Sequence, residues 1–233
     1  RLARVLRSVE VLIAPTEFVR DWFVAQGWPQ DRIAVVRHGI QPPAADNEQQ
    51  SKSGDGVSVA CVGGLAWQKG VHTLVEALNG LEGAQLWIAG DETFDPAYVS
   101  YLRSLASPNV RFLGRLEHKE VWTTLAQADV VAVPSLWYET FSLIAHEAFA
   151  AGVPVIASDL GALSEAIHHG EDGWLVPPGD VRAWRETLSR LVAEPELLNR
   201  ARAKIQPPVT QEEHLNRIEG LYARTADLYG DSP

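Results

Sequence analysis

Residues 129–159 read DVVAVPSLWYETFSLIAHEAFAAGVPVIASD and contain two short apolar runs, DVVAVPS (129–135) and GVPVIASD (152–159). Both runs are rich in valine or isoleucine, as strands of a parallel sheet are when both faces of the sheet are covered. Between them, residues 141–151 have the pattern of a helix, and Gly152 is a typical helix stop. The stretch therefore predicts a strand, a helix and a second strand in succession.

The same alternation extends over most of the chain. A regular succession of strands and helices predicts an α/β fold, namely a doubly wound parallel Rossmann-like sheet. Ligands of such sheets bind beyond the carboxyl ends of the strands, so the candidate binding loops are 63–70, 90–95, 114–117, 135–142 and 159–163. The other predicted strands are 57–64, 84–91, 110–114 and 173–178, and the other predicted helices are about 69–79, 95–106, 117–127, 161–169 and 180–193, the last with an N-cap at Gly179-Asp180.

The residues on either side of this alternation give too few elements for a second domain. Residues 44–56 are polar and without periodicity, which indicates a linker or a flexible loop. After QPPV (206–209), an amphipathic helix over about 210–230 begins with a capping box from Thr210 to Glu213. Residues 1–43 are predicted to hold a helix at about 1–8, a strand at 10–14, a helix at 16–27 and a short strand at 32–36.

Composition is that of a globular protein, with 46% hydrophobic and 21% charged residues among 233. The net charge of −10 argues against a nucleic-acid partner. No apolar run is long enough to span a membrane, and the first ten residues do not resemble a signal peptide. The single cysteine, Cys61, suits a reducing compartment, so we expect a cytoplasmic protein. The chain contains no methionine, which favours a fragment of something longer, a processed product or an engineered piece.

Glu139 and Glu147 are the first candidate site residues, with seven residues between them. If a helix begins near Phe141, the two positions differ in direction by only about 80° around its axis, so both carboxylates could flank one ligand. The free N–H groups of residues 141–144 would form an anion site between them. A ligand with phosphates in its middle and a polyol at each end, such as a nucleotide sugar, fits this pattern. One surface glutamate and one helix-face glutamate explain the spacing equally well.

Two other loops at the predicted ligand edge carry weaker signals. In VGGLAWQKG (62–70), Gly63 and Gly64 permit close approach of the backbone to a ligand, and Lys69 can meet a phosphate. This sequence is neither a Walker A loop nor a dinucleotide-binding glycine motif, and an ordinary strand–turn–helix explains it as well. In VRFLGRL (110–116), the backbone at Arg115 and Leu116 could contact a base edge, or simply form a turn.

The histidines do not form a recognisable metal motif. AHEAF (145–149) differs from a zinc-binding H-E-x-x-H because a histidine is missing at the fifth position, so we interpret His146 as a helix-face residue. His168 and His169 are expected at the end of a helix, where they complement its dipole. We predict neither a metal nor a cofactor.

Together these motifs resemble the retaining nucleotide-sugar glycosyltransferases of family 4, also called group 1, which have the GT-B fold of two facing Rossmann-like domains. The similarity runs in order from about Val57 to Leu191 and includes VGGLAWQKG, the Gly90-Asp91 turn, VRFLGRL, ADVVAVPS, and Glu139 and Glu147 with the sequence that follows them. No single motif is specific, but their order along the chain is.

The resemblance implies roles for individual residues. It implies that Glu147 bonds the ribose of the donor, that Glu139 lies against the transferred sugar, and that Lys69 neutralises the diphosphate. The family often has Gly-Arg where this chain has Gly63-Gly64, which leaves more of the diphosphate charge to Lys69, and it commonly has glycine at Ser142. The other implied contacts are the amides of Phe141, Ser142, Leu143 and Ile144 with the diphosphate or sugar, and Arg115 and Leu116 with the base.

The resemblance also implies a domain organisation: 1–43 as a remnant of the N-terminal acceptor domain, 44–56 as a linker, 57–205 as the donor-binding domain and 206–233 as a C-terminal crossover helix. The expected function is transfer of a sugar with retention, the nucleoside-diphosphate sugar being a substrate and the acceptor binding to the missing domain. We expect this chain alone to be inactive, a homodimer through 1–43 to be possible, and the full-length protein to lie in the cytoplasm or at the inner membrane face. Alternatives are a nucleotide-sugar binding module without transfer activity and, less favoured, a dinucleotide oxidoreductase.

Overall fold

The computed structural model describes residues 9–43 and 56–227. It contains two compact units, one formed by residues 1–41 with 208–233 and the other by residues 42–207. The helix predicted at 1–8 and nearly all of the linker predicted at 44–56 lie outside the described residues.

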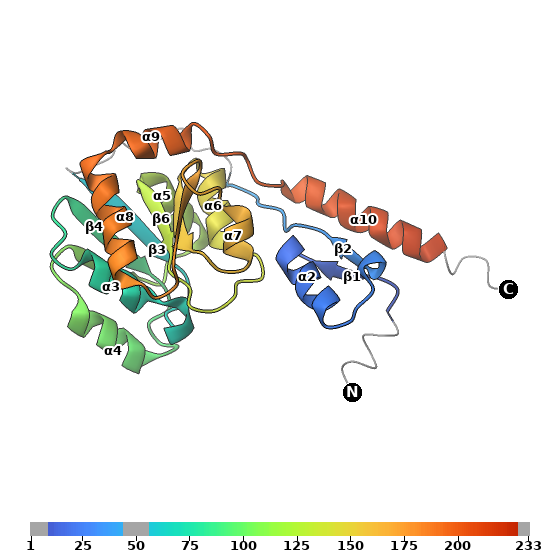
Figure 1. Ribbon diagram of the computed structural model, residues 1–233, viewed down its shortest axis with the longest axis horizontal. Coiled ribbons are helices and arrows are strands. Elements are labelled where there is room, and N and C mark those ends of the chain that lie inside the picture. Colours follow the sequence, from blue (N-terminus) through green and yellow to red (C-terminus); the bar gives the residue numbers. More distant parts are fainter. Residues whose placement is uncertain (1–8, 44–55, 228–233) are drawn as a thin grey trace. The chain divides into compact units, whose positions relative to one another are not determined.

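The larger unit is built on one six-stranded sheet, which confirms the predicted α/β class (Figure 1). All its strand pairs are parallel, and the strand order is β5-β4-β3-β6-β7-β8. The strands are β3 (Val57–Val62), β4 (Ala84–Ala89), β5 (Val110–Gly114), β6 (Val130–Val133), β7 (Val155–Ser158) and β8 (Gly173–Val176).

Helices cover both faces of this sheet, as a doubly wound fold requires (Figure 1). Alternate residues of β3 belong to different cores: Val59 and Cys61 pack with the first group of helices, whereas Ala60 packs with the second. The first group is α3 (Val71–Leu78), α4 (Pro96–Leu105), α8 (Val181–Ala193) and α9 (Glu196–Arg202), and the second is α5 (His118–Gln127), α6 (Leu143–Ala150) and α7 (Ala162–Ala166).

Helices α3, α7 and α9 differ from the sequence prediction, as does the start of α6 described below. Helix α3 starts at Val71 because Gly70 adopts a left-handed conformation (φ 66°) after a 3-10 turn, η2 (Trp67–Lys69). Helix α7 ends at Ala166, so His168 and His169 do not cap it as predicted; instead Nδ1 of His168 lies 2.8 Å from the buried Asp172 carboxylate in the turn before β8. Helix α9 was not predicted.

Helix ends that carry a clear capping signal are where the sequence places them. The Asp180 carboxylate accepts a hydrogen bond from the amide of Ala183 at the start of α8 (3.0 Å). At the start of α10 (Gln211–Asp227), the Glu213 amide donates to the Thr210 hydroxyl and the Thr210 amide donates to the Glu213 carboxylate.

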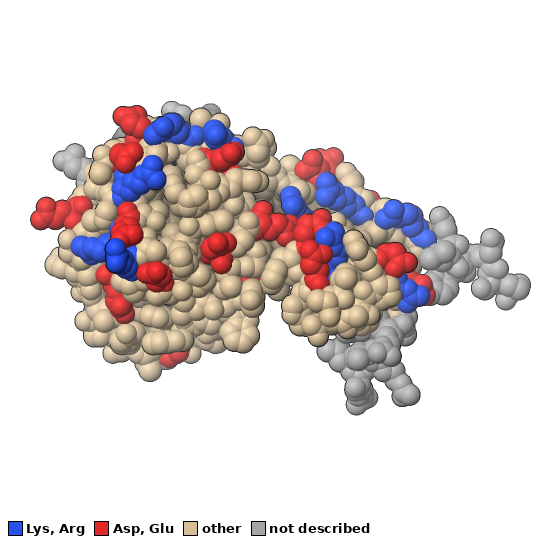
Figure 2. All heavy atoms as spheres, in the orientation of Figure 1, with Lys and Arg blue, Asp and Glu red and all other residues tan. Residues whose placement is uncertain are grey.

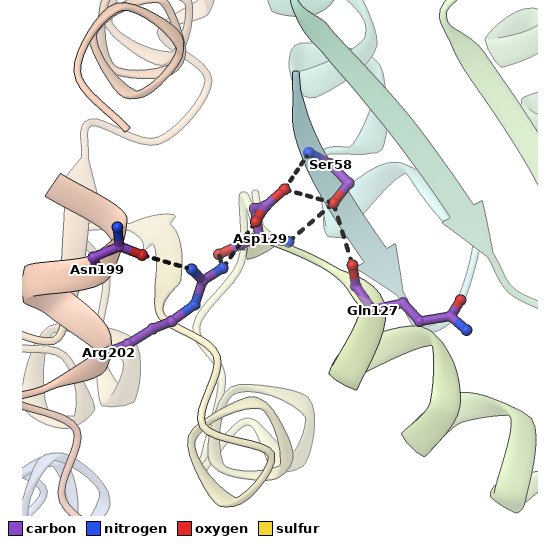
Figure 3. Close-up of polar contacts among 5 residues, drawn as sticks. All are labelled: Ser58, Gln127, Asp129, Asn199 and Arg202. Atoms are coloured by element: carbon purple, nitrogen blue, oxygen red, sulfur yellow. Dashed lines mark hydrogen bonds and ion pairs between the residues drawn. The ribbon is translucent and has the colours of Figure 1, made fainter. Parts of the chain in front are cut away.

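A polar network fastens the amino edge of the sheet, away from the predicted ligand edge (Figure 3). The Asp129 carboxylate, just before β6, accepts hydrogen bonds from the amide and hydroxyl of Ser58 in β3 (3.0 and 2.9 Å). It also pairs with Arg202 of α9 (2.9 Å), whose guanidinium donates to the Asn199 side chain as well. The network therefore joins two strands and the last helix of the unit by charge-assisted hydrogen bonds.

The surface charges of the larger unit are mixed on the face shown in Figure 2, where Lys and Arg alternate with Asp and Glu over its upper left part. Along α8, Arg182 pairs with Glu186 and Arg190 with Glu194, each four residues apart. The two opposite charges of each pair neutralise each other locally.

The smaller unit contains a short β–α–β motif and a long helix. Strands β1 (Leu12–Ala14) and β2 (Ile33–Val35) are parallel and connected through α2 (Glu17–Ala25) and a 3-10 turn, η1 (Gln30–Arg32). Ile40 forms a bridge with Thr210, and a side chain at Gly39 would overlap the backbone of Gln211. The start of α10 is therefore packed against the residues that follow β2.

Candidate active site at the sheet switch point

The strand order of the larger unit has one switch point, between β3 and β6. From β3 the chain proceeds outward through β4 and β5, whereas from β6 it proceeds outward in the other direction through β7 and β8. Ligands of open α/β sheets bind beyond the carboxyl ends of the strands at such a point. The loops that follow β3 and β6, which contain Lys69 and Glu139, are therefore the first place to examine.

Lys69 and Glu139 are in direct contact there. The ammonium nitrogen Nζ of Lys69 donates to Oε1 of Glu139 at 2.7 Å, although 70 residues separate them in sequence. Their side chains are 41% and 17% exposed, respectively. The buried Ser135 hydroxyl, at the end of β6, donates to the same Oε1 at 2.6 Å. The structure thus joins two of the predicted site residues and adds Ser135, which the sequence analysis did not identify.

Close backbone approach brings the two loops together. A Cβ on Gly70 would overlap the carbonyl oxygen of Pro134, so only glycine fits there, and its φ of 66° also favours glycine. The amide of Leu136 donates to the Gln68 carbonyl at 2.8 Å. Lys69 lies between these two contacts along the chain, and its position is therefore fixed by main-chain geometry.

The start of α6 differs from the prediction. The helix begins at Leu143 rather than near Phe141, and Ser142 precedes it with φ 66° and ψ 80°. Residues 139–142 are not helical, so the predicted rotation of about 80° between Glu139 and Glu147 does not apply. The first amides of α6 have no acceptor within the helix and no side-chain cap at Ser142, and they make this helix end attractive to an anion.

The side chains at this turn have different surroundings. Phe141 is buried, and its ring stacks on that of His146 with centroids 3.9 Å apart. Leu143 is exposed, and Ile144 packs partly against the second core. The donor contacts predicted here are the backbone amides of Phe141 to Ile144, and they stay a prediction because these observations concern side chains.

Glu147 is half-buried on α6, and burial raises the pKa of its carboxyl above the ordinary value. The electrostatic influence of His118, the first residue of α5, acts in the opposite direction and lowers this pKa. Helix α5 follows the loop that contains Arg115 and Leu116 and packs beside α6. Glu147 thus interacts with the start of α5, the helix that follows the predicted base-contacting loop.

Arg115 follows the edge strand β5, at the outer part of the ligand edge, whereas the glycine pair directly follows β3 at the switch point. The Arg115 side chain is 76% exposed and lies 3.7 Å from the Asp91 carboxylate, at the ends of β5 and β4. Gly63 has a φ of 151°, and a side chain at Gly64 would meet open space. The glycine pair is therefore compatible with a ligand, and Gly64 is not required for packing.

The aromatic side chains of Trp67, Trp137 and Tyr138 near the site are all exposed. Trp137 and Tyr138, directly before Glu139, are both exposed. Trp67, in η2, stacks on His72 of α3 with ring centroids 4.3 Å apart. Exposure of aromatic side chains could not be inferred from their positions in the sequence.

Within residues 9–43 and 56–227, no group of three or more His, Cys, Asp or Glu side chains is placed to hold a metal ion. In the same ranges, no helix has both the length and the apolar character needed to cross a bilayer.

Comparison with protein families identifies the chain. The family model of the group 1 glycosyl transferases matches residues 56–194, which include every site residue discussed above. The chain belongs to this glycosyltransferase family.

Curated relatives of this family member are longer than the chain. It is 33% identical over 180 residues to a glycogen synthase of Mycobacterium tuberculosis, a match that covers 75% of the chain and 43% of the relative. It is 30% identical over 241 residues to the D-inositol 3-phosphate glycosyltransferase of Mycolicibacterium smegmatis, covering 97% of the chain and 55% of the relative. The chain thus spans about half the length of these proteins.

Solved GT-B glycosyltransferases have the same fold. A sucrose-phosphate synthase from Thermosynechococcus elongatus superposes with a TM-score of 0.81 at 26% identity, over 98% of this chain and 61% of that protein. The Anabaena protein HepE, solved with UDP and glucose, superposes with a TM-score of 0.80 at 22% identity, over 94% of this chain and 64% of HepE.

Proposed function

We propose that the larger unit is the donor-binding half of a retaining GT-B glycosyltransferase and that it binds a nucleoside-diphosphate sugar at the switch point of its sheet. One observation carries this proposal: Lys69 and Glu139, from loops 70 residues apart, meet at 2.7 Å where β3 and β6 end. The complexes of HepE with UDP and with UDP-glucose give a precedent for this ligand class on the same fold.

In this proposal the diphosphate binds Lys69 and the first amides of α6. The Lys69–Glu139 ion pair is more than one-third exposed on the lysine side, and such pairs contribute only about 0.2–1 kcal/mol. Lys69 can therefore transfer its hydrogen bonds to a phosphate at little cost. The amides of Ser142, Leu143 and Ile144 supply fixed partial positive charge for the same group.

Glu139 and Glu147 bind the two ends of the donor. Glu139, held by Ser135, accepts hydrogen bonds from the transferred sugar and stabilises positive charge at its ring as the glycosidic bond breaks. Glu147 accepts hydrogen bonds from the ribose, and the backbone at Arg115 and Leu116 contacts the base. The leaving diphosphate gains stabilisation from groups already in place, which is electrostatic preorganisation.

Transfer also requires a binding site for the acceptor, and we assign this site to the remainder of a longer protein. Residues 1–43 then end the acceptor domain and 206–233 form the returning helix, so that the chain by itself binds donor without completing transfer. The alternative, a donor-binding module whose longer form also lacks transfer activity, differs in one measurable outcome: sugar transfer by the longer protein.

Lys69→Ala tests the proposal directly. It should weaken binding of the matching nucleoside diphosphate at least tenfold, by roughly 1.4 kcal/mol or more, while nucleoside binding changes less than about twofold. Calorimetry with UDP, GDP and ADP, each beside its nucleoside, measures both quantities. Arg182→Ala, which removes an exposed cation of α8, is the control. Equal weakening of nucleoside and nucleoside diphosphate would contradict the phosphate role of Lys69.

A further inference from the structure

The turn before α6 has an unusual conformation. Among the residues that the structure describes, Ser142 is the one non-glycine residue with a positive φ. A side chain makes this left-handed conformation unfavourable, so the surrounding structure must hold it.

Two interactions of His146 lie at this turn. Its Nδ1 is 3.0 Å from the Ser142 carbonyl oxygen, and its ring stacks on Phe141 with an interplanar angle of 11°. The backbone amide of His146 is 3.5 Å from the same carbonyl, at the long limit for a helical hydrogen bond. Since a carbonyl oxygen only accepts, Nδ1 must carry the hydrogen. The imidazole therefore supplies the short hydrogen bond that the backbone of the first turn makes poorly.

We propose that His146 is a positioning residue: it holds Ser142 in its left-handed conformation and thereby directs the amides of Ser142 to Ile144 toward the donor diphosphate. This inference rests on the proposed function. His146 acts through the turn, with Phe141 as a second support, and does not touch the donor.

If His146 acts by holding Ser142, the effects of substitutions at positions 142 and 146 should depend on each other. Glycine adopts a left-handed conformation without steric cost, so a glycine at position 142 does not need the histidine. Serine does need it. Replacing Ser142 by glycine should therefore suppress the effect of losing the imidazole, whereas a general packing role for His146 would persist in both backgrounds.

A double-mutant cycle on the full chain, with inorganic pyrophosphate as the probe in calorimetry, tests this coupling. His146→Leu keeps apolar bulk against Phe141 but removes the donor, and it should weaken pyrophosphate binding about fivefold to tenfold. Ser142→Gly, which keeps the backbone amide, is the second background of the cycle, and adding His146→Leu to it should cost less than about twofold in affinity. His146→Asn, whose amide nitrogen replaces Nδ1, should retain affinity within about threefold.

Two controls separate the possible outcomes. His168→Leu alters a histidine at the amino edge of the sheet and should leave pyrophosphate affinity unchanged, while thermal unfolding confirms that each variant is folded. Equal loss from His146→Leu in both backgrounds, or no loss in the serine background, overturns the inference while the wild-type affinity still supports the proposed function. A wild-type chain that binds neither pyrophosphate nor any nucleoside diphosphate overturns both.

Discussion

Lys69 Nζ and Glu139 Oε1 lie 2.7 Å apart, so the cation proposed for the diphosphate and the carboxylate proposed for the sugar are paired with each other. The pair keeps both side chains at the switch point, and the ion pair itself contributes little net stabilisation. If the diphosphate binds Lys69 as proposed, we expect Glu139 to oppose its binding, because the carboxylate competes for Lys69 and repels the phosphates.

Glu139→Gln should therefore improve nucleoside-diphosphate binding while abolishing transfer by the longer protein. The change removes one negative charge near the phosphates, which is worth about 1 kcal/mol in a solvent-accessible site, or roughly fivefold in affinity. Calorimetry with UDP or GDP measures it, and Glu186→Gln on the exposed side of α8 is the matched control. Weaker binding of the diphosphate by Glu139→Gln would contradict this competition.

Gly70→Ala should destabilise the fold and disrupt phosphate binding together. The left-handed φ alone costs about 1–2 kcal/mol, and overlap of the new methyl group with the Pro134 carbonyl adds to this cost. Chemical denaturation and diphosphate titration give the two readouts.

The matched control is Gly80→Ala, because Gly80 has a φ of 67° but no atom within 4 Å of the added Cβ. It should show the conformational cost without the overlap or the loss of binding. Similar free energies of unfolding for the two variants would show that the approach of Gly70 to Pro134 is not tight.

Gly64→Arg should strengthen diphosphate binding. The resemblance described above implies an arginine here in many relatives, and a side chain at Gly64 would meet open space without a positive φ. A guanidinium can bond phosphate oxygens in pairs, so we expect about a tenfold gain for a nucleoside diphosphate and none for the nucleoside. The comparison variant is Gly64→Ala, and an unchanged affinity for Gly64→Arg would place the diphosphate away from this loop.

Glu147→Gln should change how stability depends on pH. Burial raises the pKa of the Glu147 carboxyl, so the folded chain binds this proton more tightly than the unfolded chain does. This contribution to the free energy of unfolding therefore falls as pH rises from about 4.3, the ordinary glutamate pKa, through the raised folded-state pKa. The glutamine variant lacks this pH dependence of the free energy of unfolding.

Urea denaturation across acidic to neutral pH measures the effect. The variant and wild type should have similar stability at about pH 4, and the variant should gain relative stability toward pH 7. Glu194→Gln, whose side chain is exposed at the end of α8, is the control. A constant difference between the variant and wild type would mean that the Glu147 proton does not matter to folding.

Periodicity was sufficient for the sheet because buried parallel strands such as Val57–Val62 are continuous apolar runs. It did not reveal where helices begin, because the left-handed residues Gly70 and Ser142 delay α3 and α6. Serine gives no signal for such a conformation, and the hydrogen bond between His146 and the Ser142 carbonyl became visible only in three dimensions.

The sequence indicated Lys69 and Glu139 as candidate site residues but not the contact between them. The structure places Lys69 beside Glu139, a contact that spacing could not supply because it depends on the pairing of β3 with β6. Ser135 was missed for the same reason: its hydroxyl matters only through the carboxylate it meets. The roles of Glu147, Arg115 and Leu116 in donor binding remain predictions.

The network of Ser58, Asp129 and Arg202 has a consequence for how this protein could diversify. Because it anchors the sheet at the edge that bears none of the proposed donor contacts, substitutions that retune donor preference leave this anchor intact. Substitutions that change donor specificity can accumulate at the ligand edge while the network at the amino edge continues to stabilise the sheet.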